Sequence, residues 1–259
     1  MKIARYVVDD APSYGVVMSE DGEPAWLAQV GGDPLYPPVS ATGVRHELGD
    51  VRLLAPVIPR SKVIGVGRNY AEHAAELGNE VRGEPLLFLM PNTAVCGPDD
   101  PVVLPDFARD VHYEGELAVV IGRVCKDVPR ERALDVVLGY TCANDVSARD
   151  LQAADKQWAR AKGCDTFCPL GPWIETELDP ADVEIRTRLD GRVVQEDSTA
   201  LMLHDVPALI AHISRAFTLL PGDVILTGTP KGVGPVDAGQ RVEVEIEGIG
   251  ALSNPFVRR

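Results

Sequence analysis

Two glutamates separated by one glycine stand at the start of an apolar segment. Glu114 and Glu116 precede Leu117–Ile121, which is apolar at every position, as is typical of a strand covered on both faces. Because residues two apart on a strand project from the same face, both carboxylates are expected to point the same way. Like charges this close repel each other unless a cation lies between them. The spacing leaves two interpretations open, a metal site and a salt-bridged strand entrance, since Glu-x-Glu is short and common.

A third carboxylate follows another strand-like stretch, Leu138–Ala143. Asp145 lies between this stretch and Ser147–Asp150, whose pattern resembles a capping box and predicts the start of a helix. An aspartate at a strand-to-helix corner is well placed for a functional site. Three carboxylates without a Cys or His partner would select a hard cation, Mg²⁺ or Mn²⁺, with water and substrate completing an octahedral shell.

A histidine and a glutamate three residues apart form a second candidate group. The segment from Asn69 to Glu76 has the composition of a short helix, on which His73 and Glu76 share a face. The carboxylate would then orient the imidazole, fix its tautomer and raise its basicity, giving a general base that activates water near neutral pH. The alternative is a surface pair without a catalytic role.

A glycine-rich segment, Gly228–Gly234, follows a predicted strand. It lacks the spacing of a phosphate-binding loop, so it does not indicate a nucleotide site. Its backbone N–H groups and the Thr229 hydroxyl are candidates for holding a carboxylate, and a plain hairpin loop is the alternative. The chain has no Gly-x-Ser-x-Gly motif, and His46–Asp50 stops short of His-Glu-x-x-His, which disfavours a serine esterase and a zincin.

The charge of the chain excludes some partners. Lys and Arg number 25 against 39 Asp and Glu, a formal charge of −14, which disfavours nucleic acid and anionic membrane surfaces. An anionic substrate would therefore need local positive charge from a metal or from a few Lys and Arg residues. The start of the chain has no signal-peptide pattern, and no segment approaches the roughly 18 apolar residues of a membrane span, so we expect a cytoplasmic protein.

These candidate residues require a strand-rich framework to position them. Short apolar pieces separated by Asp, Gly and Pro predict hairpins over residues 2–59, followed by a linker at Ala55–Arg60. A larger domain begins with the apolar run after Lys62. One helix is clear, with Asp205 as its N-cap and an apolar face of Leu209, Ile213 and their neighbours. The pattern predicts an α+β fold dominated by strands.

Four motifs in register resemble the fumarylacetoacetate hydrolase family, and four in the right order are more specific than any one alone. The resemblance covers about Lys62 to the C-terminus, and the motifs are Gly67–Tyr70 leading to His73, His112–Glu116, Asn144–Asp150 and Gly228–Pro230. It implies a mixed β-roll catalytic domain over residues 59–259, a small N-terminal β domain over 1–58 and a homodimer.

The resemblance also implies roles for single residues. Glu114, Glu116 and Asp145 match the metal ligands, so the expected cofactor is Mg²⁺ or Mn²⁺. His73 and Glu76 match a catalytic dyad on a loop, from Asn69 to about Gly83, that closes over the substrate. The implied catalytic lysine is Lys162, and the implied substrate-binding residues are Arg68, Tyr70, Arg149, Gln152 and Thr229.

The resemblance favours C–C hydrolysis of a small 2-oxo acid, an acylpyruvate or fumarylpyruvate, through a metal-stabilised enolate. This reaction ranks first because a His-Glu pair suited to activating water is present. The alternatives within the family are an oxaloacetate decarboxylase and a 2-hydroxyhepta-2,4-diene-1,7-dioate isomerase, and fold does not choose among them. An alternative of a different class is a catalytically silent module that binds a metal or ligand.

Overall fold

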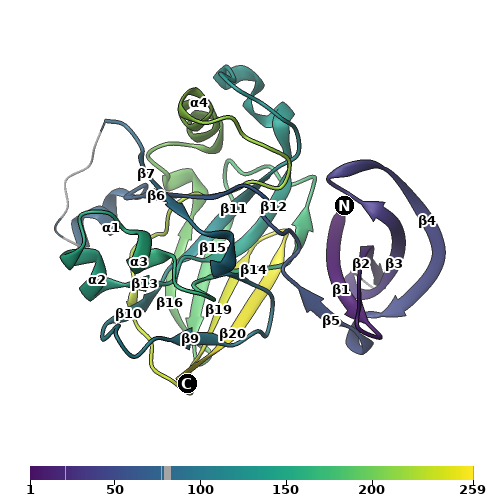
Figure 1. Ribbon diagram of the computed structural model, residues 1–259, viewed down its shortest axis with the longest axis horizontal. Coiled ribbons are helices and arrows are strands. Elements are labelled where there is room, and N and C mark those ends of the chain that lie inside the picture. The colour runs from purple at the N-terminus through teal and green to yellow at the C-terminus, as the bar shows by residue number, and fades with distance from the viewer. Residues whose placement is uncertain (21, 77, 79–82, 259) are drawn as a thin grey trace.

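The computed structural model describes residues 1–20, 22–76, 78 and 83–258. Over these residues the chain is rich in strands, which form mixed sheets, and it carries few helices (Figure 1). The strand-rich α+β fold class expected from the sequence is therefore confirmed. Part of the expected substrate-covering loop, residues 77 and 79–82, lies outside the described residues.

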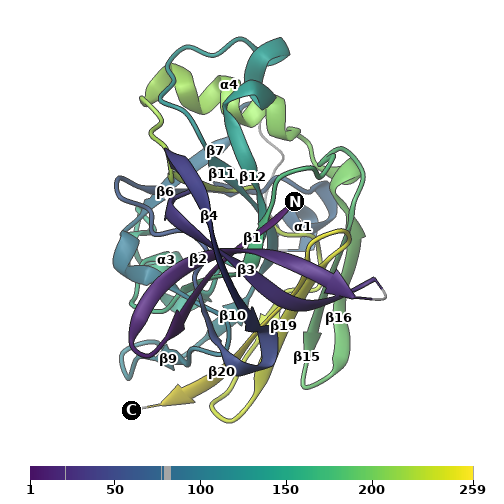
Figure 2. The same ribbon diagram turned by 90° about the vertical axis from the view of Figure 1, so that its right-hand side faces the viewer.

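The N-terminal strands form an antiparallel meander that extends the main sheet. Their bounds are β1 Lys2–Val8, β2 Ala11–Glu20, β3 Glu23–Asp33, β4 Tyr36–Glu47 and β5 Arg52–Leu54. Figure 2 brings this meander to the front. The start of β1 pairs with β14 (Cys168–Glu175), with Ile3 opposite Ile174. The expected N-terminal hairpins are present, and they continue the 12-stranded sheet of the larger part.

The strands that carry the candidate site are neighbours in this sheet, in the order β14-β12-β11-β17-β6-β7. Their bounds are β6 Val63–Gly67, β7 Leu86–Met90, β11 Gly115–Ile121, β12 Val137–Asn144 and β17 Val224–Leu226. β11 is antiparallel to β12 and β17, whereas β17 and β6 are parallel. The C-terminal ends of β6, β12 and β17 therefore meet the N-terminal end of β11 at one edge. Every residue of β11 is buried, as its apolar run predicted.

Two smaller sheets complete the framework. β13 (Ser147–Ala148), β10 (Val111–Tyr113) and β18 (Gly234–Pro235) form one of them. The other runs β16-β15-β19-β20-β9, with bounds Arg192–Ser198, Glu184–Leu189, Arg241–Ile246, Gly250–Arg258 and Val102–Leu104, and β8 (Val95–Cys96) pairs with β14. Along β19, Val242, Val244 and Ile246 are buried between more exposed glutamates, as strict alternation predicts.

The helices are short and lie outside the sheets (Figure 1). The α-helices are α1 Ala71–Glu76, α2 Arg149–Ala154, α3 Ala159–Lys162 and α4 Val206–Ala216, and the 3₁₀ turns are Leu48–Asp50, Asn92–Ala94, Arg130–Val136 and Thr199–Leu201. α4 confirms the predicted helix, since the Asp205 carboxylate accepts a hydrogen bond from the Ala208 N–H at 2.9 Å. Among the described residues, no helix is long and apolar enough to cross a membrane.

The expected capping box at Ser147 is wrong in its local geometry. Ser147 and Ala148 form strand β13, and α2 begins only at Arg149 without a side-chain cap. The Ser147 hydroxyl donates instead to the Asp145 carbonyl at 2.9 Å, and Asp150 accepts from the Arg109 N–H at 3.1 Å. Ser147 therefore stabilises the turn after β12, whereas Asp150 binds the backbone at Arg109. Pairing of β13 with β10 competes with an earlier start of the helix.

Candidate metal centre and active site

Three buried carboxylates converge at the strand edge, and we call Glu114, Glu116 and Asp145 the carboxylate cluster. One oxygen from each lies within 4.8 Å of the others, and none of the three residues is more than 4% exposed. The register of β11 against β12 brings them together, because Gly115 pairs with Asn144. The Asp145 N–H then donates to the Glu114 carbonyl at 2.9 Å. Two segments about thirty residues apart in sequence thus supply one site.

Hydrogen bonds from neighbouring strand ends hold the glutamates in place. The Glu114 N–H donates to Asn144 Oδ1 at 2.9 Å, at the end of β12. The Gly228 N–H, just after β17, donates to Glu116 Oε2 at 2.7 Å. The glycine-rich segment Gly228–Gly234 therefore contributes a backbone donor to the cluster. The segment connects β17 to β18, which belong to different sheets, so it is not the plain hairpin loop that was the alternative.

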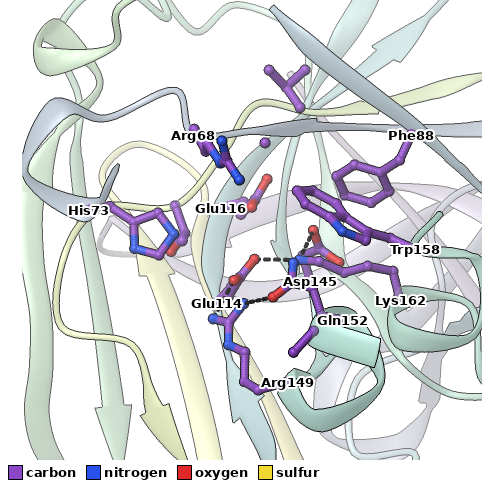
Figure 3. Close-up of a pocket in the computed structure, with 14 residues that line it drawn as sticks. Arg68, His73, Phe88, Glu114, Glu116, Asp145, Arg149, Gln152, Trp158 and Lys162 are labelled. Atoms are coloured by element: carbon purple, nitrogen blue, oxygen red, sulfur yellow. Dashed lines mark hydrogen bonds and ion pairs between the residues drawn. The ribbon is translucent and has the colours of Figure 1, made fainter. Parts of the chain in front are cut away.

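Two cationic side chains contact the cluster. The Lys162 ammonium lies 2.6 Å from Glu114 Oε2 and 2.7 Å from Asp145 Oδ2, and the Arg149 guanidinium lies 2.5 Å from Glu114 Oε1 (Figure 3). Gln152 orients this arginine by accepting from its Nη1 at 3.0 Å. Burial opposes the charge of Lys162, but the carboxylates of Asp145 and Glu114 outweigh it and raise the pKa of the ammonium. The lysine therefore stays charged.

The three carboxylates differ in how well their charge is stabilised. Burial disfavours the charge of Glu114, but Lys162 and Arg149 overcome it and hold the pKa of Glu114 below its usual value. Burial and then repulsion from Asp145 and Glu114 raise the pKa of Glu116 well above its usual value. Burial also raises the pKa of Asp145, to about 6, against the attraction of Lys162. If all three carboxylates were ionised, the cluster would carry one more negative charge than Lys162 and Arg149 offset, and the raised pKa of Glu116 reflects this excess as well as burial.

The donor set of the cluster fits a divalent cation. Asp145 Oδ1 is buried without a hydrogen-bond partner, and Glu116 forms no ion pair within the described ranges 1–20, 22–76, 78 and 83–258. A buried polar atom of this kind costs free energy unless something binds it. Oxygen ligands without nitrogen or sulfur suit a hard cation, and a positive centre in addition to Lys162 and Arg149 would relieve the repulsion at Glu116. The salt-bridge interpretation accounts for Glu114 but not for these two groups.

The histidine–glutamate pair lies beside the cluster. His73, on α1, is 5% exposed, and its Nδ1 atom lies 3.4 Å from Glu76 Oε2. The Glu76 carboxylate also accepts from the Gly232 N–H at 3.2 Å, which connects α1 to the glycine-rich segment. If Nδ1 carries the proton toward Glu76, Nε2 is left as a proton acceptor. Burial lowers the pKa of His73, so the neutral form is favoured.

One cavity of about 310 Å³ collects most of the predicted site residues (Figure 3). Its lining includes the carboxylate cluster together with His73, Lys162, Arg68, Arg149, Gln152 and Thr229. Glu76 does not line the cavity, and it contacts the lining residue His73. Acidic, basic and imidazole groups therefore face one cavity, as a site for a small anionic molecule requires.

Tyr70 occupies a different place from the other predicted substrate-binding residues. It is not among the residues that line the cavity, and it is only 2% exposed. Its hydroxyl is buried without a hydrogen-bond partner among the described residues, and burial followed by the charge of Glu116 raises its pKa. Tyr70 is thus buried outside the cavity lining, within electrostatic reach of Glu116.

Thr229 is held by a residue that the motifs did not indicate. Gln195, on β16 and 2% exposed, donates to Thr229 Oγ1 at 2.8 Å and to the Pro230 carbonyl at 2.9 Å, and its Oε1 accepts from the Gly115 N–H at 3.0 Å. The Thr229 hydroxyl then donates to the Gly115 carbonyl at 2.8 Å. Gln195 thus connects the glycine-rich segment to the peptide between the two cluster glutamates. The proton of the Thr229 hydroxyl is engaged by the backbone, which leaves its oxygen as an acceptor.

Replacing Gln195 by Leu is expected to lower the free energy of unfolding by about 2–5 kcal/mol, because it leaves buried backbone groups of Gly115 and Pro230 unpaired. Urea unfolding measures this loss. Gln240→Leu is a matched control, since Gln240 also makes side-chain hydrogen bonds, to Asp237 and Asp190, but these bonds are exposed, so water can replace them. Equal losses for the two variants would contradict the role of Gln195.

Two aromatic residues in the cavity wall were also not indicated by the sequence. Phe88, on β7, and Trp158, just before α3, pack edge to face with their centroids 5.4 Å apart. The Lys162 ammonium lies 5.2 Å from the centroid of Phe88. In the sequence Phe88 looks like one residue of an apolar strand, so only its packing assigns it to the site.

Comparison with known families gives two matches that together cover most of the chain. Residues 62–257 match the family described as fumarylacetoacetate (FAA) hydrolase, C-terminal. Residues 1–56 match the family described as Rv2993c-like, N-terminal. The first match contains every residue of the candidate site described above.

Individual relatives carry several activities in their names. The chain is similar over its full length to the crystal structure of a 5-carboxymethyl-2-hydroxymuconate delta-isomerase from Mycobacterium smegmatis, with 51% identity, a TM-score of 0.92 and full coverage of both chains. A maleylpyruvate hydrolase from Sphingobium sp. SYK-6, solved with manganese(II) and pyruvate, is 35% identical with a TM-score of 0.81, over 100% of this chain and 99% of that one. The mitochondrial oxaloacetate tautomerase fahd2 of Xenopus laevis is 45% identical over 80% of this chain and 69% of its own length.

Proposed function

The chain belongs to the fumarylacetoacetate hydrolase family, and on this basis we propose that it hydrolyses a C–C bond of a small acylpyruvate-type 2-oxo acid with the help of Mg²⁺ or Mn²⁺. The observation that carries the proposal is the position of His73, which faces the same cavity as the carboxylate cluster. A base able to activate water and a site for a divalent cation then act on one bound molecule. The relative solved with manganese and pyruvate supports this choice of ligands.

Two groups of side chains carry separate tasks in this reaction. A divalent cation held by Glu114, Glu116 and Asp145 would supply Lewis-acid stabilisation for the enolate that C–C cleavage leaves. His73, oriented by Glu76 at 3.4 Å, accepts a proton from water. The Lys162 ammonium, buried beside the cluster, places positive charge where negative charge develops. Burial of these groups limits access of bulk water and strengthens their interactions.

A second candidate is proton transfer without hydrolysis, as in tautomerisation or decarboxylation of oxaloacetate or isomerisation of an unsaturated 2-hydroxy acid. The names of two relatives favour it, the oxaloacetate tautomerase of Xenopus laevis and the isomerase of Mycobacterium smegmatis. The same His73 would then move a proton on the substrate carbon skeleton, with no attacking water. Both candidates use the carboxylate cluster in the same way, so an experiment must distinguish hydrolysis from proton transfer.

An activity screen distinguishes the two candidates. The purified protein is assayed with Mn²⁺ or Mg²⁺ against acylpyruvates, oxaloacetate and unsaturated 2-hydroxy dienoates. Loss of enol absorbance together with release of pyruvate from an acylpyruvate is the expected result. Conversion of oxaloacetate or a dienoate alone, without acylpyruvate cleavage, would replace hydrolysis by the second candidate.

The pH dependence of hydrolysis is expected to follow the pKa of His73. Burial lowers this pKa below its ordinary value of 6.5, although the carboxylates of Glu114 and Glu76 partly oppose the shift. The neutral imidazole is the active base, and it predominates above its pKa. As the pH is lowered, kcat/KM should therefore stay constant until the pH is below 6.5, and it should then fall about tenfold for each further pH unit. The profile is measured at saturating Mn²⁺. An acid limb centred above pH 6.5 would assign the rate-controlling base to another group.

A further inference from the structure

The glycine-rich segment Gly228–Gly234 contacts the helix that carries His73. The Gly232 N–H lies 3.2 Å from both carboxylate oxygens of Glu76, and Glu76 Oε2 lies 3.4 Å from His73 Nδ1. Because the same carboxylate accepts from the Gly232 backbone and faces the imidazole, the place of this backbone influences how the imidazole is held. The orientation of His73 therefore depends on Gly232 as well as on α1.

Gly232 lies at a position that requires glycine. Its φ angle is +95°, where an L side chain is strained, and a Cβ atom there would lie 2.2 Å from the Val194 carbonyl oxygen. The backbone of β16 therefore packs directly against Gly232. This close approach limits how far the Gly232 backbone can move in that direction.

Tyr113 forms a second contact with Gly232. Its hydroxyl donates to the Gly232 carbonyl at 3.1 Å, and the residue is only 4% exposed. Tyr113 pairs with Gly234 between β10 and β18, and a Cβ atom at Gly234 would lie 2.8 Å from the tyrosine hydroxyl oxygen. The absence of a side chain at Gly234 thus leaves room for the hydroxyl to reach Gly232. The carbonyl and the N–H of Gly232 meet at one Cα atom, so a hydrogen bond to the carbonyl also restricts where the N–H points.

Another connection between the segment and α1 is exposed to water. The Lys231 ammonium pairs with the Glu72 carboxylate, and the two side chains are 55% and 64% exposed. Ion pairs this exposed contribute little, because water screens them and two long side chains lose freedom. The hydrogen bond from the buried Tyr113 is therefore the connection expected to affect His73.

We propose that Tyr113 is a positioning residue, which fixes the Gly232 backbone so that Glu76 holds the His73 imidazole with its proton on Nδ1. The Nε2 atom is then left as the proton acceptor. Tyr113 is not among the residues that line the cavity of the carboxylate cluster, so its hydroxyl acts on the reaction through Gly232 and Glu76. This inference rests on the proposed function for the role of His73 as the base.

The test is a double-mutant cycle of Tyr113→Phe and His73→Ala, assayed with acetylpyruvate at saturating Mn²⁺. Tyr113→Phe removes only the hydroxyl and is expected to lower kcat by about three- to tenfold, the effect of one hydrogen bond. KM and the Mn²⁺ affinity should stay unchanged. In the His73→Ala background the same change should cause no further fall in kcat, because the group on which it acts is gone.

Tyr140→Phe is the matched control, because Tyr140 is also 4% exposed but does not line the cavity, and it should leave kcat unchanged. Gly234→Ala is a second probe, since its Cβ atom would displace the Tyr113 hydroxyl, and it should lower kcat in the same way. It replaces Tyr113→Phe in the cycle if that variant does not fold. Native turnover in the Tyr113 variant, or an equal fall in kcat without His73, would overturn the proposal.

A spectroscopic measurement separates this proposal from the proposed reaction. Long-range ¹⁵N–¹H spectra of the imidazole rings, recorded with Mg²⁺ above pH 6.5, report which nitrogen of His73 carries the proton. The spectrum of His73→Ala identifies its signals among the five histidines. Tyr113→Phe should move population from the Nδ1–H form to the Nε2–H form. If the wild type does not hydrolyse acetylpyruvate, or His73→Ala keeps native turnover, the proposed reaction is rejected. The spectrum then decides the positioning role alone, and unchanged tautomers in Tyr113→Phe would overturn it.

Discussion

Changing His73 to Ala is expected to lower the turnover of an acylpyruvate by about a hundredfold or more, the usual effect of removing a general base. The affinity for Mn²⁺ should change little, because the imidazole contacts Glu76 and is not one of the three convergent carboxylates. Steady-state kinetics at saturating Mn²⁺ gives the first quantity, and calorimetric titration gives the second. Decarboxylation of oxaloacetate should suffer less, since it needs no attacking water.

His212→Ala is a matched control for this variant. His212 lies on α4, outside the residues that line the cavity of the carboxylate cluster, so its loss should leave both quantities unchanged. A His73→Ala protein that hydrolyses acylpyruvate at the native rate would remove this histidine from the mechanism. It would also remove the main reason for ranking hydrolysis above proton transfer.

Changing Glu116 to Gln is expected to reduce the affinity for Mn²⁺ by about a hundredfold or more, because it removes a charge and weakens one of three ligands. The metal-free variant should unfold at no lower urea concentration than the wild type. The reason is that burial and repulsion from Asp145 and Glu114 already disfavour the charge of Glu116, as its raised pKa indicates. The Gly228 N–H keeps an oxygen acceptor in the amide.

Calorimetric titration with Mn²⁺ and urea unfolding without metal measure the two effects. Glu131→Gln is the control, because Glu131 is exposed in the 3₁₀ turn Arg130–Val136, which precedes β12 at the end of the strand opposite to the cluster. An unchanged Mn²⁺ affinity in the Glu116 variant would show that the cluster is not the metal site. A large loss of metal-free stability would show that Glu116 has a structural role beyond cation binding.

The sequence by itself determined the features that depend on neighbours along the chain. The unbroken apolar run Leu117–Ile121 predicted a strand buried on both faces. Asp205 and the apolar spacing after it predicted α4. These features follow from the periods of the strand and the helix, which a short window of sequence contains. The motifs in register likewise indicated the fumarylacetoacetate hydrolase family.

Only the tertiary structure decided which distant residues meet. Asp145 lies beside Glu114 because of the register of β12 on β11, and a shift of one residue would turn the side chains to the other face. Gln195 reaches Gly115 from β16, and Phe88 meets Trp158 over the glycines of β6, although no local pattern marks these residues. Ser147 shows the converse. Its local pattern predicted the start of a helix, but Ser147 lies in β13 because this strand pairs with β10. Contacts between distant segments depend on sheet register and packing, which local propensity does not encode.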